Sequence, residues 1–85
     1  MSLLKRFWFK FEKLRQPTAL NFGCGITAYG YNDAMRLLRE QVFRGEPLPK
    51  ILEFFQDIDV STLDSGHVLP NIGSVVNRGV WFPKL

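Results

Sequence analysis

Strict alternation of side chains from Arg6 to Glu12 is the feature of this sequence that most restricts its fold. Phe7, Phe9 and Phe11 occupy every second position, which places the three rings on one side of an extended strand. A helix would instead leave Phe9 on the side opposite the neighbouring apolar residues, and aromatic residues favour strands. The segment is therefore predicted to be a strand with one buried face.

The next alternating segment runs from Phe22 to Tyr29, after a connection over Arg15 to Asn21 that contains Pro17. Two such segments joined by a short connection are predicted to pair as a hairpin. Gly23 and Gly25 fall on one face of the second strand, where a missing side chain lets the strand bulge or lets another backbone approach. The opposite, apolar face consists of Phe22, Cys24, Ile26 and Ala28.

One main helix is predicted after the hairpin, from Asp33 to Arg44, with Gly30 or Asn32 as its N-cap. Its apolar residues recur at helical spacing, and Gly45 followed by two prolines ends it. The apolar stripe consists of Ala34, Leu37, Leu38 and Val42.

Residues 51–60 fit two structures. The apolar spacing favours a short helix from Pro49 to Gln56 with Ile58 to Thr62 extended, whereas a single strand from Ile51 onward fits nearly as well. Residues 61–77 read as a polar loop, and a loop of that length in a compact domain is often functional. Gly79 to Phe82 is predicted to be a last short strand, stopped by Pro83.

These elements predict an α+β fold with a small antiparallel sheet of three to four strands, made of the N-terminal hairpin and the C-terminal strand. One main helix packs on one face of the sheet, joined by a second short helix if residues 49–56 are helical. The opposite face is then expected to be the working surface. A chain of 85 residues is expected to form a single small domain, residues 1–85.

The cysteine count and the hydropathy pattern bear on location. The single Cys24 has no partner for an internal disulfide, and no group of residues has metal-ligand spacing, so a reducing compartment is expected. Lysines and arginines interrupt the apolar residues at the start of the chain, which is unlike a secretory signal, and no run approaches the length of a membrane span. The cytoplasm is the expected location, with no membrane span.

Positive charge is concentrated near the start of the chain, where residues 1–20 hold five basic residues and one acidic residue. Basic residues on the solvent face of a strand commonly deter aggregation, which is the simpler explanation. Weak nucleic-acid binding is an alternative, with Trp8 and Trp81 as stacking platforms. A further alternative is a basic amphipathic helix over residues 3–15 on a membrane surface.

The segment from Gly23 to Ala28 matches the letters of the dinucleotide-binding pattern GxGxxA. That pattern needs its glycines in a turn between a strand and a helix, and here they lie inside a predicted strand. Cys24 falls on the apolar face of the same strand, so it is expected to be a buried, unreactive thiol. No cofactor is expected.

His67 is the only histidine, and it lies among polar residues that include Asp59 and Asp64. Asp, Ser and Asn in a glycine-containing loop more often bond to their own backbone than form a catalytic site. A small enzyme centred on His67 is therefore kept as an alternative, and the chain is not expected to be an enzyme.

Twelve aromatic residues in so small a domain are more than its core is expected to bury. The favoured function is a non-catalytic protein-interaction module that binds a protein partner, which includes the case of a homodimer, through aromatic residues on the sheet and the loop at 61–78. Trp8, Tyr29 and Trp81 are expected to form one exposed patch. The complete set of predicted partner-binding residues is Trp8, Tyr29, His67, Asn71, Arg78 and Trp81.

His67 to Gly73, followed by Arg78 to Pro83, resembles the C-terminal pattern of a family of small uncharacterised bacterial proteins. Gly23 to Tyr29 and the predicted helix after it are similar as well. The resemblance covers most of the chain and implies a bacterial, cytoplasmic protein that stands alone. It implies no activity for any residue.

Overall fold

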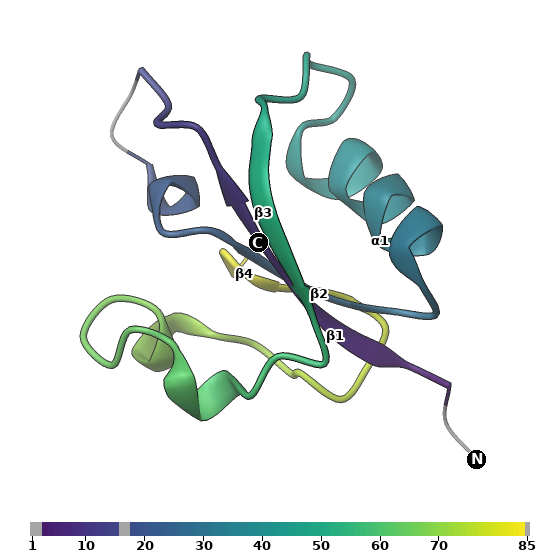
Figure 1. The fold of residues 1–85 in the computed structure, drawn as a ribbon, viewed down its shortest axis with the longest axis vertical. Helices are drawn as coiled ribbons and strands as arrows, with labels where there is room; N and C mark the ends of the chain where they lie inside the picture. Colours follow the sequence, from purple (N-terminus) through teal and green to yellow (C-terminus); the bar gives the residue numbers. More distant parts are fainter. Residues whose placement is uncertain (1–2, 16–17, 85) are drawn as a thin grey trace.

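A computed structural model describes residues 3–15 and 18–84, and Pro17 of the predicted connection lies outside this range. Four antiparallel strands form one sheet in the order β3-β1-β2-β4 (Figure 1). Their bounds are β1 Lys5–Phe11, β2 Cys24–Ala28, β3 Ile51–Gln56 and β4 Gly79–Phe82. The α+β fold, the N-terminal hairpin and the C-terminal strand are as predicted.

Strand β1 lies inside the sheet, and its middle residues are buried on both sides. Phe7 and Phe9 are fully buried and Phe11 nearly so, on the side that faces the helix, while Trp8 is buried on the other side. In the register of the sheet, Phe7 of β1 lies opposite Ile26 of β2, and Phe9 of β1 lies opposite Phe54 of β3. A strand buried on both faces needs a covering layer on each side.

The helix supplies the first layer. Helix α1, Tyr31–Leu37, begins after the N-cap Gly30 and continues as a π-helical turn over Leu38–Val42. It starts two residues before the predicted position and ends close to the predicted one. Its buried residues pack on the phenylalanines of β1 and on Cys24 and Ile26 of β2, and they are Ala34, Met35, Leu37 and Leu38.

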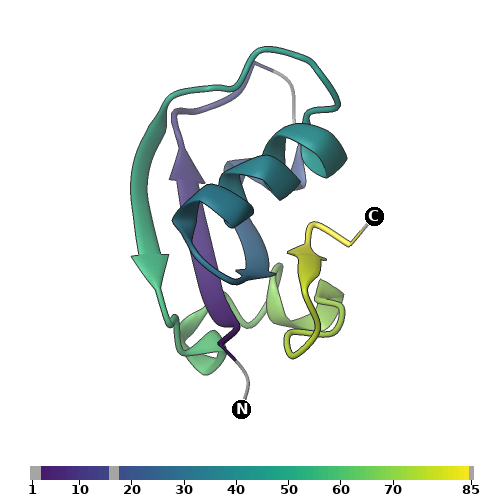
Figure 2. The ribbon, with the colours of Figure 1, turned by 90° about the vertical axis from the view of Figure 1, so that its right-hand side faces the viewer.

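A long segment supplies the second layer. Residues 57–78, here called the covering segment, lie on the side of the sheet opposite α1 (Figures 1 and 2). Val68 of this segment is buried with Trp8, Trp81 and Phe82. The prediction that this face of the sheet is an open working surface is therefore wrong, because a small sheet with a tryptophan on each of two strands gains more from covering that face than from exposing it.

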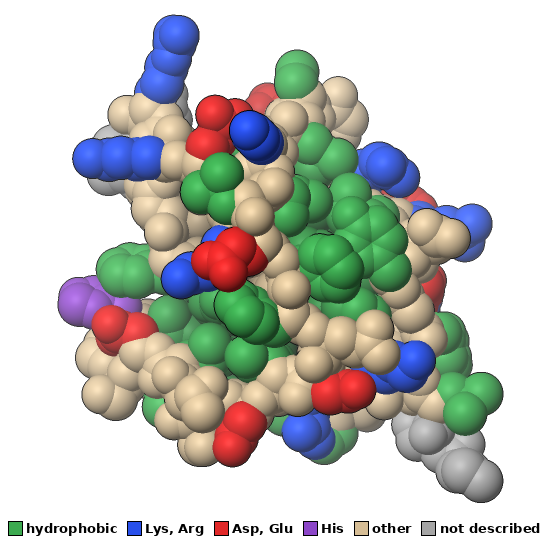
Figure 3. All heavy atoms as spheres, in the orientation of Figure 1, with side chains coloured by type: hydrophobic (Ala, Val, Ile, Leu, Met, Phe, Trp, Pro, Cys, Tyr) green, Lys and Arg blue, Asp and Glu red, His purple; other side chains and the backbone are tan. Residues whose placement is uncertain are grey.

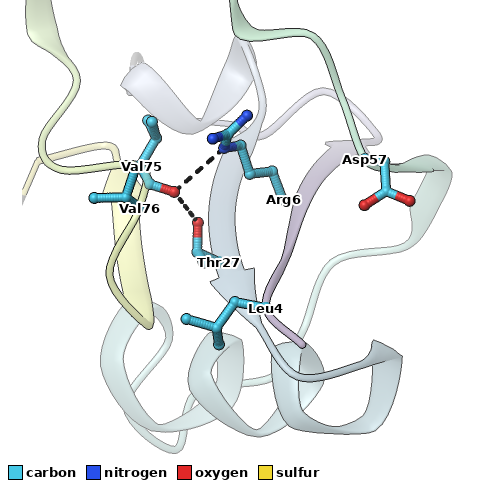
Figure 4. A pocket seen from close by; sticks show the side chains of 6 residues that line it. All are labelled: Leu4, Arg6, Thr27, Asp57, Val75 and Val76. Atoms are coloured by element: carbon cyan, nitrogen blue, oxygen red, sulfur yellow. Dashed lines mark hydrogen bonds between the residues drawn. The ribbon is translucent and has the colours of Figure 1, made fainter. Parts of the chain in front are cut away.

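One carbonyl oxygen fastens the covering segment to the sheet. The Val75 oxygen accepts a hydrogen bond of 2.7 Å from the Thr27 hydroxyl and one of 3.4 Å from Arg6 Nε (Figure 4). Thr27 is buried on β2 and Arg6 lies on β1, so both central strands hold the same point of the loop. The basic residue Arg6 thus has a structural role.

Two glycines make room for the tryptophans. A Cβ at Gly25 would lie 2.4 Å from the Trp81 ring, and a Cβ at Gly23 would lie 2.4 Å from the Trp8 ring. Trp8 and Trp81 stack on each other with ring centroids 5.8 Å apart. The predicted backbone approach is found at Gly23, where a Cβ would lie 2.8 Å from the Phe9 carbonyl oxygen, and the register of β2 and β4 shifts between Gly25 and Ile26. The groups nearest to both glycines are the indole rings, which were not predicted.

The open question over residues 51–60 is resolved in favour of a strand. The favoured helix from Pro49 to Gln56 is wrong, because Ile51–Gln56 pairs along β1. The extended segment from Ile58 to Thr62 is wrong in part, because Val60–Thr62 is a 3₁₀ turn capped by the Asp59 side chain. No second helix longer than such turns is present in residues 3–15 and 18–84.

Phe22 departs from the predicted hairpin. Strand β2 begins at Cys24, and Phe22 instead follows a 3₁₀ turn at Ala19–Asn21 and is 41% exposed. The positive φ of Gly23, 133°, separates the turn from the strand and breaks the alternation that placed Phe22 on the apolar face.

The membrane-surface alternative is wrong as well. It requires a helix over residues 3–15, and Lys5–Phe11 is a paired strand with its phenylalanines in the core. None of the helices within the described residues has the length and apolar character that crossing a bilayer requires.

Replacing Gly25 with alanine tests the packing of the tryptophans. We expect Gly25→Ala to lower the free energy of unfolding by about 1–3 kcal/mol, because the new methyl group displaces the Trp81 ring from a packed layer. Urea unfolding followed by tryptophan fluorescence measures the loss. Gly66→Ala is the matched control, since its Cβ would meet only Asp64 Oδ1 at 3.5 Å; equal stability of the two variants would contradict this account.

Candidate protein-interaction surface

Strand β3 forms one edge of the sheet. It pairs with β1 on one side, and no strand of the described chain pairs with its other side. Strand β4, at the opposite edge, differs because the Gly73 N–H donates a 2.8 Å hydrogen bond to the Trp81 oxygen. The covering segment therefore shields the β4 edge, while the backbone of β3 remains open to pairing (Figure 2).

The side chains of β3 are unusually apolar for such an edge. Leu52 is 57% exposed, Phe54 47% and Phe55 39%, which makes half of this six-residue strand exposed and apolar. Edge strands usually carry charges or prolines that discourage pairing with other chains. Within β3 only Glu53 is charged.

The exposed rings of β3 lie on both sides of the sheet. Phe54 is opposite the buried Phe9 and contacts Tyr31 of α1, with ring centroids 4.8 Å apart. Phe55 is opposite Trp8, on the side of the covering segment. Figure 3 faces this edge and shows apolar side chains on either side of the strand. We call Leu52 to Gln56 together with Tyr31 the β3 edge.

Charges frame the β3 edge in a simple pattern. Glu53 lies opposite Lys10 of β1, so its charge has a neighbour of opposite sign within the sheet. Lys50 precedes the strand and Asp57 follows it, and both are exposed. The strand therefore carries positive charge at its beginning and negative charge at its end.

Two of the predicted anchors are not at the surface. Trp8 is 4% exposed and Trp81 1%, because the covering segment closes over them. The prediction of one exposed patch of Trp8, Tyr29 and Trp81 is therefore wrong. Tyr29 alone of the three is exposed, at 59%.

Tyr29 and Arg78 meet at the start of α1. The Arg78 guanidinium lies 6.0 Å from the centre of the Tyr29 ring and donates hydrogen bonds from two nitrogens to the carboxylate of Asp33. The Tyr29 N–H donates to the same carboxylate at 3.1 Å. The Arg78 side chain lowers the pKa of Asp33 to about 2. These contacts join β4 to the helix.

His67 and Asn71 lie in the covering segment. The His67 ring stacks on Phe22 with centroids 4.8 Å apart, and its Nδ1 is 3.2 Å from Asp64 Oδ1. Asn71 Nδ2 donates to the His67 oxygen at 2.9 Å. A shallow hollow lies beside this group, with Phe82 also in its wall.

The Asp64 carboxylate accepts hydrogen bonds from the backbone of a turn in addition to its contact with the His67 ring. Its Oδ1 accepts the N–H groups of Gly66 at 2.8 Å and His67 at 2.7 Å, and these bonds hold the pKa of Asp64 below its usual range. Asp59 in the same way accepts from the N–H and hydroxyl of Ser61. This is the backbone-bonding pattern expected of such loop residues. In residues 3–15 and 18–84, no group of three or more His, Cys, Asp and Glu side chains is arranged to hold a metal ion.

Cys24 is fully buried in the core, as predicted, and burial raises the pKa of its thiol to about 12. A thiol with so high a pKa forms almost no thiolate near neutral pH.

The residues that sequence reasoning missed are Tyr31, Leu52, Phe54 and Phe55. A signal for Leu52, Phe54 and Phe55 existed in the strand alternative for residues 51–60, because successive side chains of a strand point to opposite faces and one covering layer cannot bury both. The sequence pattern could not choose between the strand and the helix.

Thiol labelling tests the burial of Cys24. We expect the native protein at pH 8 to react with a disulfide reagent at least about a hundredfold more slowly than the same chain in guanidinium, because the native thiol is both shielded and protonated. Absorbance reports the released reagent. Fast release of one equivalent from the native protein would contradict this expectation.

The ion pair of Asp33 and Arg78 should make stability depend on acid. The pKa of Asp33 is about 2 in the folded chain and 3.8 ordinarily, so the folded state is favoured above pH 4, and this advantage is lost as the pH falls toward 2. We expect Arg78→Gln to destabilise the protein at pH 6 and to have a much smaller effect at pH 2.

Urea unfolding at pH 2, 3, 4 and 6 measures that difference. Arg39→Gln is the control, because it removes the same charge from an exposed site whose guanidinium is not among the causes of the Asp33 shift. A cost of Arg78→Gln that stays constant over this pH range would show that the ion pair does not stabilise the fold.

Comparison of this chain with protein-family models, with curated proteins and with solved structures finds no match. The resemblance to a bacterial family therefore stays a prediction, and the function has to be argued from the surface itself.

Proposed function

We propose that this protein is a non-catalytic interaction module that binds an extended polypeptide segment along the β3 edge. The observation that carries the proposal is an edge strand with one neighbour on which Leu52, Phe54 and Phe55 are all between 39% and 57% exposed. A partner segment adds to the sheet by backbone hydrogen bonds, and its alternating side chains meet the rings.

The two kinds of contact support each other. The open backbone of β3 offers donors and acceptors that any extended chain satisfies, which supplies affinity without choosing a partner. The rings on the two faces make the binding selective for certain partner segments. Phe54 and Tyr31, on the side of α1, favour an apolar side chain in the partner. Aromatic residues that are exposed beside unpaired backbone are a common anchor for such contacts.

The two alternatives have less support. Nucleic-acid binding needed Trp8 and Trp81 as platforms for bases, and both rings are buried. An enzyme centred on His67 has the contact of 3.2 Å to Asp64 in its favour, but the same carboxylate oxygen already holds two backbone N–H groups of a turn. The loop at 61–78 is expected from the sequence to contribute to partner binding, but Val68 within it forms part of the core. The proposed surface therefore does not include this loop.

Site-specific photo-cross-linking in the cells that make the protein tests the proposal. A benzoylphenylalanine introduced at Phe54 keeps an aromatic side chain at the centre of the β3 edge, and we expect it to form covalent adducts with protein. Val76, which is 64% exposed on the covering segment, is the matched control position.

Adducts that form from position 54 and not from position 76 would support binding at this edge. Their masses give the identity of the partner. If position 54 yields no protein adduct, or no more than position 76, the interaction proposal fails.

A further inference from the structure

We infer that the segment which pairs with the β3 edge is β3 of a second copy of this chain, in antiparallel orientation, so that two sheets join into one. This inference rests on the proposed function and names its partner. It is argued from the symmetry of the strand, from the placement of its charges and from the contrast between the two edges of the sheet.

A two-fold axis perpendicular to the sheet relates two identical antiparallel strands. Such an axis keeps each face of the sheet on its own side, so the α1 side of one copy continues into the α1 side of the other. Residues that lie opposite each other must then belong to the same face. Only registers centred on a single residue satisfy this condition within the regular part of β3, from Glu53 to Gln56.

Charge and ring packing select among these registers. A pairing centred on Glu53 would put that carboxylate directly opposite its own copy, and like charges directly opposite destabilise a strand pair. A pairing centred on Phe55 would put Phe54 opposite Gln56 and separate the two Phe54 rings. A pairing centred on Phe54 avoids both losses, because Phe54 then lies opposite its own copy and Glu53 lies opposite Phe55.

The ends of the strand are complementary in the same arrangement. Antiparallel pairing brings the end of one β3, which the exposed Asp57 follows, toward the start of the other, which the exposed Lys50 precedes, so opposite charges approach each other at both ends. Parallel pairing would bring Lys50 beside Lys50. The charges at the two ends of β3 therefore favour antiparallel pairing of two copies over parallel pairing.

Dimerisation buries the most apolar side-chain surface at Phe54, where the two-fold axis passes. The Phe54 ring of each copy is already packed against Tyr31 at 4.8 Å and Phe9 at 6.2 Å between ring centroids. A directly opposite pair places the two Phe54 side chains in contact on the α1 side, flanked by both tyrosines. This buries rings that are 40–47% exposed in the single chain.

The other edge of the sheet limits the assembly to two chains. Strand β4 is four residues long, and the Trp81 oxygen on it is already bonded to Gly73 of the covering segment. Joining β3 of one copy to β4 of the next would need that bond to break. Growth through alternating edges is therefore disfavoured, and a closed dimer results.

Sedimentation velocity over a range of protein concentrations tests the inference. We expect a species with the mass of two 9.8 kDa chains. Phe54→Lys places two ammonium groups opposite each other at the axis, and we expect dimerisation to weaken by about tenfold or more, since each 1.4 kcal/mol changes an association constant tenfold. Val76→Lys adds the same charge at an exposed site on the covering segment and should leave the dimer intact.

A mixing experiment separates loss of the dimer from loss of the fold. The Phe54→Lys chain and the Phe54→Glu chain should each be folded by circular dichroism and should each dimerise more weakly than the wild type in sedimentation velocity. An equal mixture of the two should regain dimers, because opposite charges then meet across the axis. A register not centred on Phe54 would not give this rescue, so its absence overturns the inference.

The outcomes for the two proposals are distinct. A monomeric wild-type chain at every concentration, combined with a different protein cross-linked at position 54, overturns the dimer and leaves the interaction proposal standing. A monomer that cross-links to nothing from that position overturns both. Self-adducts from position 54 together with the mixing rescue support both.

Discussion

The stacked pair of Trp8 and Trp81 is the contact on which the architecture depends. The rings lie over Gly23, just before β2, and Gly25 within it, where any side chain would collide with them. Each of these rings is among the largest apolar surfaces in the chain, and leaving either one exposed would cost about 2 kcal/mol or more. The covering segment avoids that cost, because it shields both rings from solvent and buries Val68 with them.

Covering one face has a consequence for the edges. The covering segment bonds to β4 through Gly73, and its Val75 carbonyl oxygen accepts hydrogen bonds from groups on β1 and β2. Strand β3 receives no comparable cover along its outer side, although Phe54 contacts Tyr31 of α1 and Ile51 packs against the core. One edge of the sheet is therefore closed and the other is open. The contrast gives the molecule a single direction in which its sheet can be extended.

The chemistry of the remaining polar residues fits a structural role. Asp33 and Arg78 tie the helix to the last strand, and Asp59 and Asp64 hold the ends of turns in the covering segment. Their lowered pKa values follow from hydrogen bonds that a turn or an ion pair supplies. Cys24 is protected by the same core that the sheet and helix form.

The sequence by itself determined β1, α1 and β4, but left β3 open between a helix and a strand. Alternation identified β1, helical spacing identified α1, and the glycine and proline positions bounded the last strand, because side-chain periodicity depends only on backbone geometry. It did not determine which apolar side chains are buried. Trp8 and Phe55 both lie on the same face of neighbouring strands, yet one is buried and the other is 39% exposed. That difference comes from the order of the strands and the path of the covering segment, which are set by packing between residues far apart in the chain. The tertiary structure alone therefore decided that the tryptophans belong to the core and that β3 forms the open edge.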